Sequence, residues 1–298
     1  MFFYRAGVPG WMEMIKRKME PGRRGRIFSL CNGLSYAEGV VLSLAAGALL
    51  DQNPGIWKAL FAGAAIVGMG AVAVQSKVEM EEEAGERGEL KEVIVRPWRD
   101  SWQLLRGRRD FAAFQWGFML AGFGIMLIQP ALPMFAVDDL GVSYLEVAGA
   151  VSVAKGLGFS LSSWGWARGL ERLSLFRIAS LVFLSVGLFP AMLALSSVWG
   201  IWWFFGAYFW YGVGQGGSHL VWNMSGPIFA GKEESSKYTG VGVVLAGLRG
   251  AVGPPLGGLL AGSIGAVQVM ILGGLFCIYS GIRMFRREER ISSQLKEG

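Results

Sequence analysis

Eight apolar runs of about 20 residues divide the chain, and they constrain its fold more than any other feature. A helix needs about 20 mainly apolar residues to cross the ~30 Å hydrocarbon core of a bilayer. Within that core, only helices and closed barrels satisfy their own backbone hydrogen bonds. The sequence therefore predicts an all-α polytopic membrane bundle of about eight spans. The expected spans cover residues 30–50, 57–76, 112–136, 143–166, 175–196, 199–223, 238–261 and 264–283.

The charged residues are few and do not indicate a soluble, nucleic-acid-binding fold. Only 17% of the 298 residues are charged and 53% are hydrophobic, whereas a soluble domain carries about 25% charged residues. The net charge is +6, but the Lys and Arg residues lie between the apolar runs. A nucleic-acid-binding protein needs such residues on one face of a soluble fold. The composition therefore favours a membrane protein without nucleic acid as a partner.

The cations are sorted between alternate connections of the eight runs. The two termini and three of the connections hold 25 of the 28 Lys and Arg residues, and the other four connections hold none. Because basic segments stay on the cytoplasmic side of a membrane, both termini and the segment 77–110 are predicted to be cytoplasmic. The expected location is a plasma (inner) membrane.

The first pair of runs resembles the last pair at an offset of 211 residues. Gly39 and Gly47 align with Gly250 and Gly258, and both pairs follow a basic segment. Repeats in the same orientation relate the two halves of one class of transporter. The alternative is a chance match, because small-residue patterns are common in membrane helices.

Several short motifs resemble those of the major facilitator superfamily. Residues 24–29 (RGRIFS) resemble the cytoplasmic segment that leads into that family's fifth span. Residues 253–258 (GPPLGG) resemble a Gly-Pro-x-x-Gly-Gly pattern of its antiporters, here on the expected eleventh span. Gly165, Arg168 and Arg172 resemble a degenerate form of its loop between spans eight and nine. The resemblance implies a transporter built from two six-span halves.

The resemblance also implies a division of the chain. Residues 1–76 correspond to the end of the N-terminal bundle, with two spans, and residues 77–110 to a charged cytoplasmic linker. Residues 111–284 correspond to the six-span C-terminal bundle, and residues 285–298 to a cytoplasmic tail. The first four of the family's twelve spans have no counterpart, and residues 1–10 are compatible with the end of a fourth.

Two cations, Lys155 and Arg249, are expected near the middle of spans. An unpaired charge at that depth costs at least ~3 kcal/mol, so each cation needs a partner, a water-filled path or a function. One hypothesis is that both attract an anionic group of a substrate. The alternative is a structural ion pair, with Glu38 as the acceptor.

Glu38 aligns with Arg249 in the repeat and has two interpretations of its own. A carboxyl group in a low dielectric takes up a proton more readily, which would suit transport driven by a coupling proton. As the counter-ion of Lys155, Glu38 would instead stay charged.

Polar residues of two further spans are candidates for solute contact. Gln215, His219 and Asn223 have the i, i+4, i+8 spacing of one helix face. They contact either a solute or, in the alternative, neighbouring helices through hydrogen bonds. Gln129 lies beside Pro130 near the outer end of another span. Proline kinks helices, and this kink is either a gating hinge or static.

No pattern in the sequence indicates an enzyme, a cofactor or a metal centre. His219 is the only histidine, and Cys31 and Cys277 do not have metal-ligand spacing. The expected function is transport of a small solute across the lipid bilayer by alternating access, with an anionic solute if Lys155 and Arg249 bind it. Two alternatives stay open: a truncated fragment that does not transport, and a membrane scaffold or assembly protein.

The segment 77–110 is acidic in its first half and basic in its second. We expect a solvated linker whose basic half lies on anionic lipid headgroups. Residues 11–19 combine Trp11 and Met12 with basic residues and are expected to form an interfacial helix.

Overall fold

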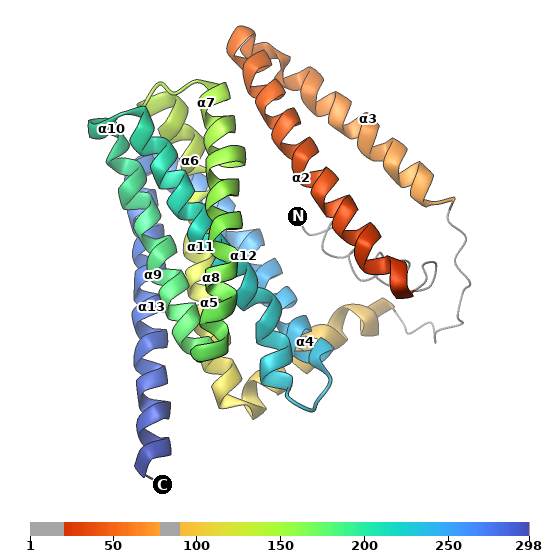
Figure 1. The fold of residues 1–298 in the computed structure, drawn as a ribbon, viewed down its shortest axis with the longest axis vertical. Coiled ribbons are helices and arrows are strands. Elements are labelled where there is room, and N and C mark those ends of the chain that lie inside the picture. Colours follow the sequence, from red (N-terminus) through yellow and green to blue (C-terminus); the bar gives the residue numbers. More distant parts are fainter. Residues whose placement is uncertain (1–20, 78–89, 298) are drawn as a thin grey trace. The chain divides into compact units, whose positions relative to one another are not determined.

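A computed structural model of the chain describes residues 21–77 and 90–297 (Figure 1). Nearly all of these residues are helical, and none of them forms a strand. The longer helices are α2 (Pro21–Gln52), α3 (Trp57–Gln75), α4 (Leu90–Gly107), α5 (Arg109–Ile128), α8 (Lys155–Arg172), α9 (Leu175–Ala194), α11 (Ile201–Ala230), α12 (Ser235–Ile264) and α13 (Ala266–Glu297). The shorter elements are η1 (Pro54–Ile56), α6 (Ala131–Pro133), α7 (Tyr144–Gly149), α10 (Ser196–Trp199) and two π-helices, η2 (Met134–Asp139) and η3 (Ala150–Ala154).

The all-α prediction is confirmed, and each expected span is helical over most of its length. Among the described residues, six helices are long and apolar enough to cross a membrane. They correspond to the first, second, third, fifth, seventh and eighth expected spans. Apolar runs of this length therefore located these helices correctly.

The other two expected spans are helical but less apolar. Residues 143–166 form α7, η3 and most of α8, and they include five Ser residues and Lys155. Residues 199–223 lie mostly in α11, where Gln215 and His219 lower the hydropathy. Polar residues of this kind are tolerated in a membrane where they face protein or water. These two segments stay predicted spans.

Two segments take a form that the sequence did not predict. The basic half of the expected linker contains the helix α4, because apolar residues recur there at helical spacing. Residues 285–297 of the expected tail continue α13 as a helix, since no Gly or Pro occurs among them. The expected interfacial helix 11–19 and most of the acidic half of the linker lie outside the described residues.

The described helices group into two compact units. The first unit contains α2, η1, α3 and α7, and the second contains α4, α5, α6, η2 and α8 to α13. One boundary between them along the chain falls inside η3, between Ser152 and Val153. The six predicted solute-binding residues all belong to the second unit, and Glu38 belongs to the first.

In the second unit, α5, α8, α9, α11, α12 and α13 run side by side (Figure 1). Glycine lets α8 and α11 approach until their backbones touch. A Cβ atom at Gly158 would lie 2.0 Å from the carbonyl oxygen of Phe209, and one at Gly212 would lie 2.0 Å from that of Lys155. Close packing of this kind holds helices together in lipid. It also places Lys155 directly against α11.

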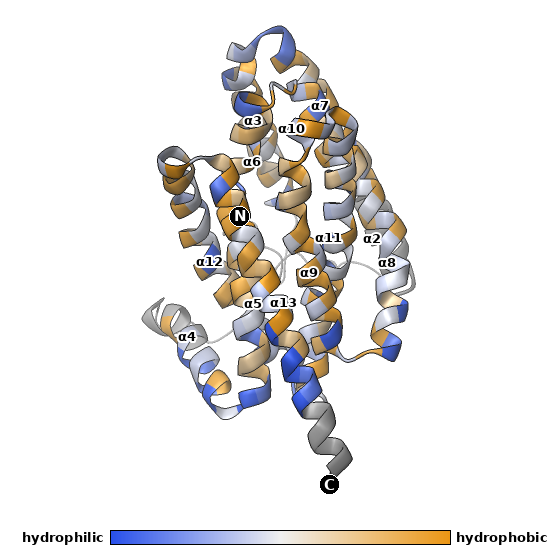
Figure 2. Cartoon of the chain, turned by 90° about the vertical axis from the view of Figure 1, so that its left-hand side faces the viewer, coloured by the Kyte–Doolittle hydropathy of each residue, from blue (hydrophilic) through white to orange (hydrophobic). Residues whose placement is uncertain are grey.

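The basic segments of the second unit gather at one end of its bundle. Arg177, near the start of α9, lies 3.9 Å from the centre of the Phe285 ring and 3.7 Å from the Glu288 carboxylate, both near the end of α13. Arg108, just before α5, donates a 3.0 Å hydrogen bond to Tyr238 near the start of α12. Figure 2 shows hydrophilic residues at the ends of these helices and hydrophobic residues along them. Within this unit, the basic connections thus lie at one end of the bundle; that this end is cytoplasmic stays a prediction.

In the first unit, the apolar side chains of α2 and α3 are largely exposed. Of the residues in an apolar 18-residue segment of each helix, 6% are buried in α2 and 0% in α3. Cβ atoms at Gly63, Gly68 and Gly70 would have no atom within 4 Å. This surface suits contact with lipid, because acyl chains are as apolar as these side chains.

Candidate solute-binding site

Three polar residues lie close together in the second unit: Tyr211 and Gln215 of α11, and Gln129 at the end of α5. Gln215 Nε2 donates a 2.9 Å hydrogen bond to the Tyr211 hydroxyl, and the Gln129 side chain lies close enough to interact with Tyr211. Tyr211 is 6% exposed, and its ring stacks on Phe189 with 4.3 Å between centroids. Gln129 is exposed and Gln215 is half-buried, so the group has an accessible side. The structure thus brings together two predicted site residues from α11 and the end of α5.

Lys155 is the first residue of α8 and follows the π-helix η3 directly. Its side chain is half-buried, and within its unit the described residues give it no hydrogen bond and no ion pair. Its carbonyl oxygen packs against Gly212, the neighbour of Tyr211. Burying an ammonium group is costly unless an anionic group or water reaches it. A π-helical turn at such a position is also frequent at functional sites.

The stripe of Gln215, His219 and Asn223 divides into two parts. Gln215 joins the Tyr211 group, whereas His219 and Asn223 are exposed. Asn223 Nδ2 lies 3.2 Å from His219 Nδ1 and donates to the His219 carbonyl oxygen at 2.9 Å. These contacts lie within α11, so among the described residues the interhelical hydrogen bonds of the alternative are absent at these two positions. His219 meets α8 through the Phe159 ring, at 5.8 Å between centroids.

Arg249 is buried on α12 and faces the backbone of α5. Its Nη1 donates a 2.9 Å hydrogen bond to the carbonyl oxygen of Phe118, and the guanidinium carbon lies 5.2 Å from the centre of that ring. Gly122 leaves room for the guanidinium, since a Cβ atom there would lie 1.7 Å from Nη1. The side chain therefore occupies a slot between two helices and is 9% exposed. Contact of Arg249 with a solute stays a prediction.

A comparison with protein families agrees with a bundle of membrane helices. The family model described as Major Facilitator Superfamily matches residues 1–253 of the chain. The chain belongs to the Major Facilitator Superfamily. A search of curated proteins found no match. Members of this family move small solutes across membranes and are not enzymes, so this chain is an integral membrane protein of the transporter class.

The remaining site residue of this major facilitator chain, Glu38, lies on α2 in the first unit and is exposed. Its pairing with Lys155 and its coupling to a proton both stay predictions. Among residues 21–77 and 90–297, no group of three His, Cys, Asp or Glu residues is arranged to hold a metal ion.

Asp51 has a role in the first unit that the sequence did not reveal. At the end of α2, its carboxylate accepts hydrogen bonds from the backbone nitrogens of Tyr144, at 2.6 Å, and Leu145, at 2.9 Å. Gly47, one turn earlier, allows this approach, because a Cβ atom there would lie 2.8 Å from the Tyr144 carbonyl oxygen. Asp51 thus holds α7, which precedes η3 and Lys155. No local pattern predicts a contact between residues 93 positions apart.

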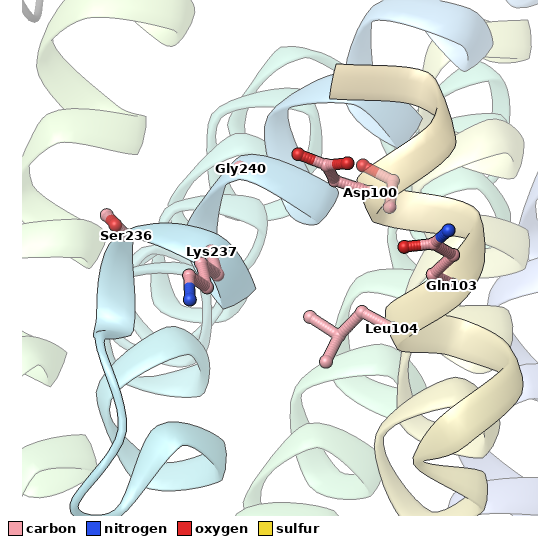
Figure 3. Close-up of a pocket in the computed structure, with 7 residues that line it drawn as sticks. Asp100, Gln103, Leu104, Ser236, Lys237 and Gly240 are labelled. Atoms are coloured by element: carbon pink, nitrogen blue, oxygen red, sulfur yellow. The ribbon is translucent and has the colours of Figure 1, made fainter. Parts of the chain in front are cut away.

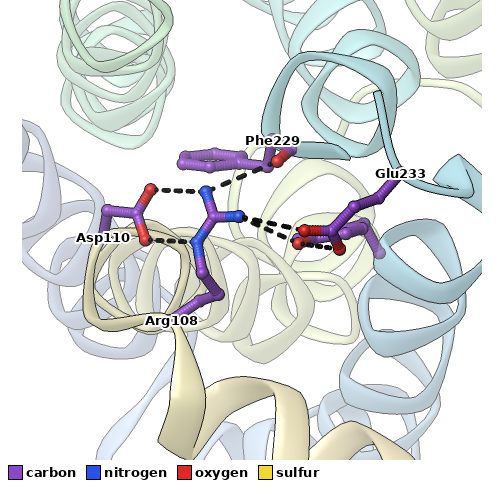
Figure 4. A network of polar contacts seen from close by, with 5 residues as sticks. Arg108, Asp110, Phe229 and Glu233 are labelled. Carbon is purple, nitrogen blue, oxygen red and sulfur yellow. Dashed lines mark hydrogen bonds and ion pairs between the residues drawn. The ribbon is translucent and has the colours of Figure 1, made fainter. Parts of the chain in front are cut away.

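A second network, at the basic end of the bundle, was also missed. Arg108 donates two hydrogen bonds to the Asp110 carboxylate, at 3.0 and 3.1 Å, and one to the Tyr238 hydroxyl (Figure 4). The Tyr238 hydroxyl donates to Glu233 at 2.8 Å, and Arg108 also reaches the Phe229 carbonyl oxygen at 3.5 Å. The hydrogen-bonded Asp110 carboxylate raises the pKa of Arg108, so the guanidinium stays charged. The network ties the α4–α5 junction to the turn between α11 and α12.

A groove of about 490 Å³ lies between α4 and α12, near this network. Asp100, Gln103 and Leu104 line it from α4, and Ser236 and Lys237 line it from α12 (Figure 3). Its charged groups are of both signs, so the groove does not select an anion or a cation. It lies at the basic end of the bundle, and the Tyr211 group lies far along α11 from that end.

Proposed function

We propose that this transporter carries a small polar solute with an anionic group and binds it between α5, α8 and α11. The observation that carries the proposal is the meeting of Gln129, Tyr211 and Gln215 beside the backbone of Lys155. Amide and hydroxyl groups in a mostly apolar site orient a ligand through hydrogen bonds, and one charged side chain adds selectivity. The Lys155 ammonium would supply that charge.

The register of α8 and α11 supports a shared site. Lys155 packs against Gly212, and Phe159, one turn further along α8, packs against Gly216 and His219 of α11. The helix face that begins at Lys155 thus follows the α11 stripe from Tyr211 towards His219. We therefore expect the Lys155 side chain to reach a solute bound at Gln215.

We infer alternating access as the mode of transport. The π-helix η3 separates α7, which Asp51 holds by two hydrogen bonds, from α8, which carries Lys155. A short irregular turn inside a helix often marks a hinge. Bending at η3 would move Lys155 while Asp51 keeps the start of α7 in place. We also place the basic end of the bundle and both termini in the cytoplasm, at a plasma (inner) membrane.

Ligand-induced thermal stabilisation of the purified full chain tests the site. A solute that binds only the folded chain raises its melting temperature, so we would screen inorganic phosphate, small carboxylates and neutral sugars. We expect some of the anions to stabilise the wild type and Lys155→Gln to lose this response. Lys232→Gln is the matched control, because Lys232 is an exposed lysine in the turn before α12. Solutes that bind would then be tested for uptake into proteoliposomes.

The outcomes separate the alternatives. An equal response of Lys155→Gln and the wild type would remove Lys155 from the site. Stabilisation by neutral sugars alone would show that the solute is not anionic. If no solute binds or enters proteoliposomes, and the chain purifies with another membrane protein in a fixed ratio, the scaffold interpretation is favoured over transport.

A further inference from the structure

We propose that α4 lies in the membrane interface and binds anionic phospholipid headgroups. The binding surface is the exposed side of the helix formed by Val95, Trp98, Arg99, Trp102 and Arg106, which we name the α4 lipid face. The inference does not depend on the proposed solute site. It requires that the chain lies in a membrane, which its family establishes, and that the basic end of the bundle faces the leaflet with anionic lipids.

The α4 lipid face combines apolar, aromatic and basic side chains at helical spacing. Val95 is 50% exposed, Trp98 52% and Trp102 58%, and Arg99 and Arg106 are exposed as well. Residues three or four positions apart lie on one side of a helix. Large exposed apolar side chains gathered on one face mark an interaction site more often than scattered ones do.

Another side of α4 is fixed to the bundle, so the lipid face points away from the protein. Ser101 is 8% exposed, and Leu104 and Leu105 pack against a buried cluster. That cluster consists of Phe111, Ala230, Tyr238 and Val241. The Arg108 network holds the junction that follows α4, at the first residue before α5. The orientation of the lipid face is therefore set by the fold.

The position of α4 indicates that a bilayer surface contacts the α4 lipid face. The helix ends at Gly107, two residues before the candidate span that begins at Arg109, so its end cannot leave the membrane surface. It also lies at the end of the bundle where the basic segments gather. Of the two leaflets, the one in contact with that end carries the anionic lipids if the basic end is cytoplasmic.

The chemistry of the face matches anionic headgroups. Tryptophan is enriched at membrane interfaces, and arginine binds phosphate through charge-assisted hydrogen bonds. The Arg106 guanidinium lies 4.8 Å from the centre of the Trp102 ring, so the aromatic and basic groups act on the same region. The neighbouring acid Asp100 lies 3.7 Å from Arg99 and lines the groove towards α12. A second copy of this basic face would repel the first.

The test uses the full chain in lipid nanodiscs, with a fluorophore that reports polarity on a single introduced cysteine. In a Cys31→Ser, Cys277→Ser background, Val95→Cys carries the label on the α4 lipid face. Phosphatidylglycerol is added stepwise to phosphatidylcholine nanodiscs. We expect the emission to shift to shorter wavelength as the anionic fraction rises, with quenching by brominated acyl chains, and we expect salt to weaken the shift.

Charge removal then tests the arginines. Each exposed arginine at a membrane surface changes affinity about fivefold. A double variant with Arg99→Gln and Arg106→Gln should therefore need a several-fold higher phosphatidylglycerol fraction for the half-maximal emission shift of the label at position 95. Arg283→Gln with Arg286→Gln on α13 removes the same charge from exposed positions and should leave that midpoint unchanged. A label at Gln103→Cys, in the groove, should not respond to the lipid composition.

Three results would overturn the proposal. The first is a Val95→Cys label that does not respond to phosphatidylglycerol. The second is an equal midpoint change in the α13 control, which would indicate an effect of net charge. The third is a shift that appears only with two copies in one nanodisc, which would indicate a protein partner.

Discussion

The helices α3 and α5 are equally apolar by mean hydropathy, and their surroundings are opposite. In an apolar 18-residue segment of α3, no residue is buried within the chain, whereas 56% of the residues in the corresponding segment of α5 are buried. Both helices are also rich in glycine. The glycines of α3 have open space beside them, but Gly122 and Gly124 of α5 lie against side chains and backbone of other helices.

The difference shows that apolarity and contact are separate properties of a membrane helix. Apolarity decides whether a segment enters the bilayer. Contact between helices in lipid depends on the shape of their surfaces, because burying apolar side chains against protein brings no hydrophobic gain over lipid. The four predictions that follow test this difference between the two units, from the largest expected effect to the smallest.

The substitution Gly212→Ala should have the largest effect. The new Cβ atom would lie 2.0 Å from the Lys155 carbonyl oxygen, so α8 and α11 must separate. Overpacking of this kind costs about 1–3 kcal/mol. Thermal unfolding in one detergent measures the loss, with Gly68→Ala in α3 as the control, where the same change meets open space. Equal destabilisation by both substitutions would show that helix contacts in the two units do not differ in tightness.

The substitution Gly122→Ala should displace the Arg249 guanidinium from its slot. The cost is smaller than at Gly212, because the end of a flexible side chain moves more easily than a backbone. Loss of the hydrogen bond from the charged Nη1 to Phe118 is expected to lower the unfolding free energy by about 1.5 kcal/mol. The same thermal unfolding assay measures it, and Gly63→Ala is the control. An unchanged melting temperature would show that the slot is not tightly packed.

Arg108→Gln tests the network at the basic end of the bundle. The network is only partly buried, so we expect a loss of about 1 kcal/mol in unfolding free energy. Arg109→Gln removes the same charge at the next residue, which is exposed, and should have almost no effect. If both variants unfold at the same temperature, the hydrogen bonds of Arg108 do not stabilise the junction.

Asp51→Asn tests the first unit, in which apolar packing is sparse among the described residues. An amide cannot accept both hydrogen bonds as the carboxylate does, so the start of α7 should open more often. A net hydrogen bond contributes about 1 kcal/mol, which corresponds to roughly fivefold faster hydrogen exchange at Tyr144 and Leu145. Asp138→Asn, an exposed acid near α7 in the chain, is the control. Unchanged exchange rates would mean that α7 is held by its own contacts.

At the candidate site, the sequence predicted the helix face of the polar residues but not their hydrogen-bond partners. The spacing of Gln215, His219 and Asn223 correctly placed them on one helix face. It did not show that Gln215 turns to Tyr211 while His219 and Asn223 bond to each other. Gln129 was proposed for its place beside a proline, and its closeness to Tyr211 depends on where the end of α5 lies relative to α11. The hydrogen-bond partners of such side chains depend on the packing of helices that are far apart in the chain.

The helices, their apolar runs and the alternation of basic connections follow from the sequence alone, because each depends on about 20 neighbouring residues and on the bilayer. The contacts between distant residues became visible in the structure alone. They are the contacts of Arg249 with the α5 backbone, of Asp51 with α7 and of Tyr211 with two glutamines. A glycine is the same residue in α3 and in α11, so the sequence alone does not show which of the two lies against another helix. Only the arrival of another helix makes one of them a point of contact.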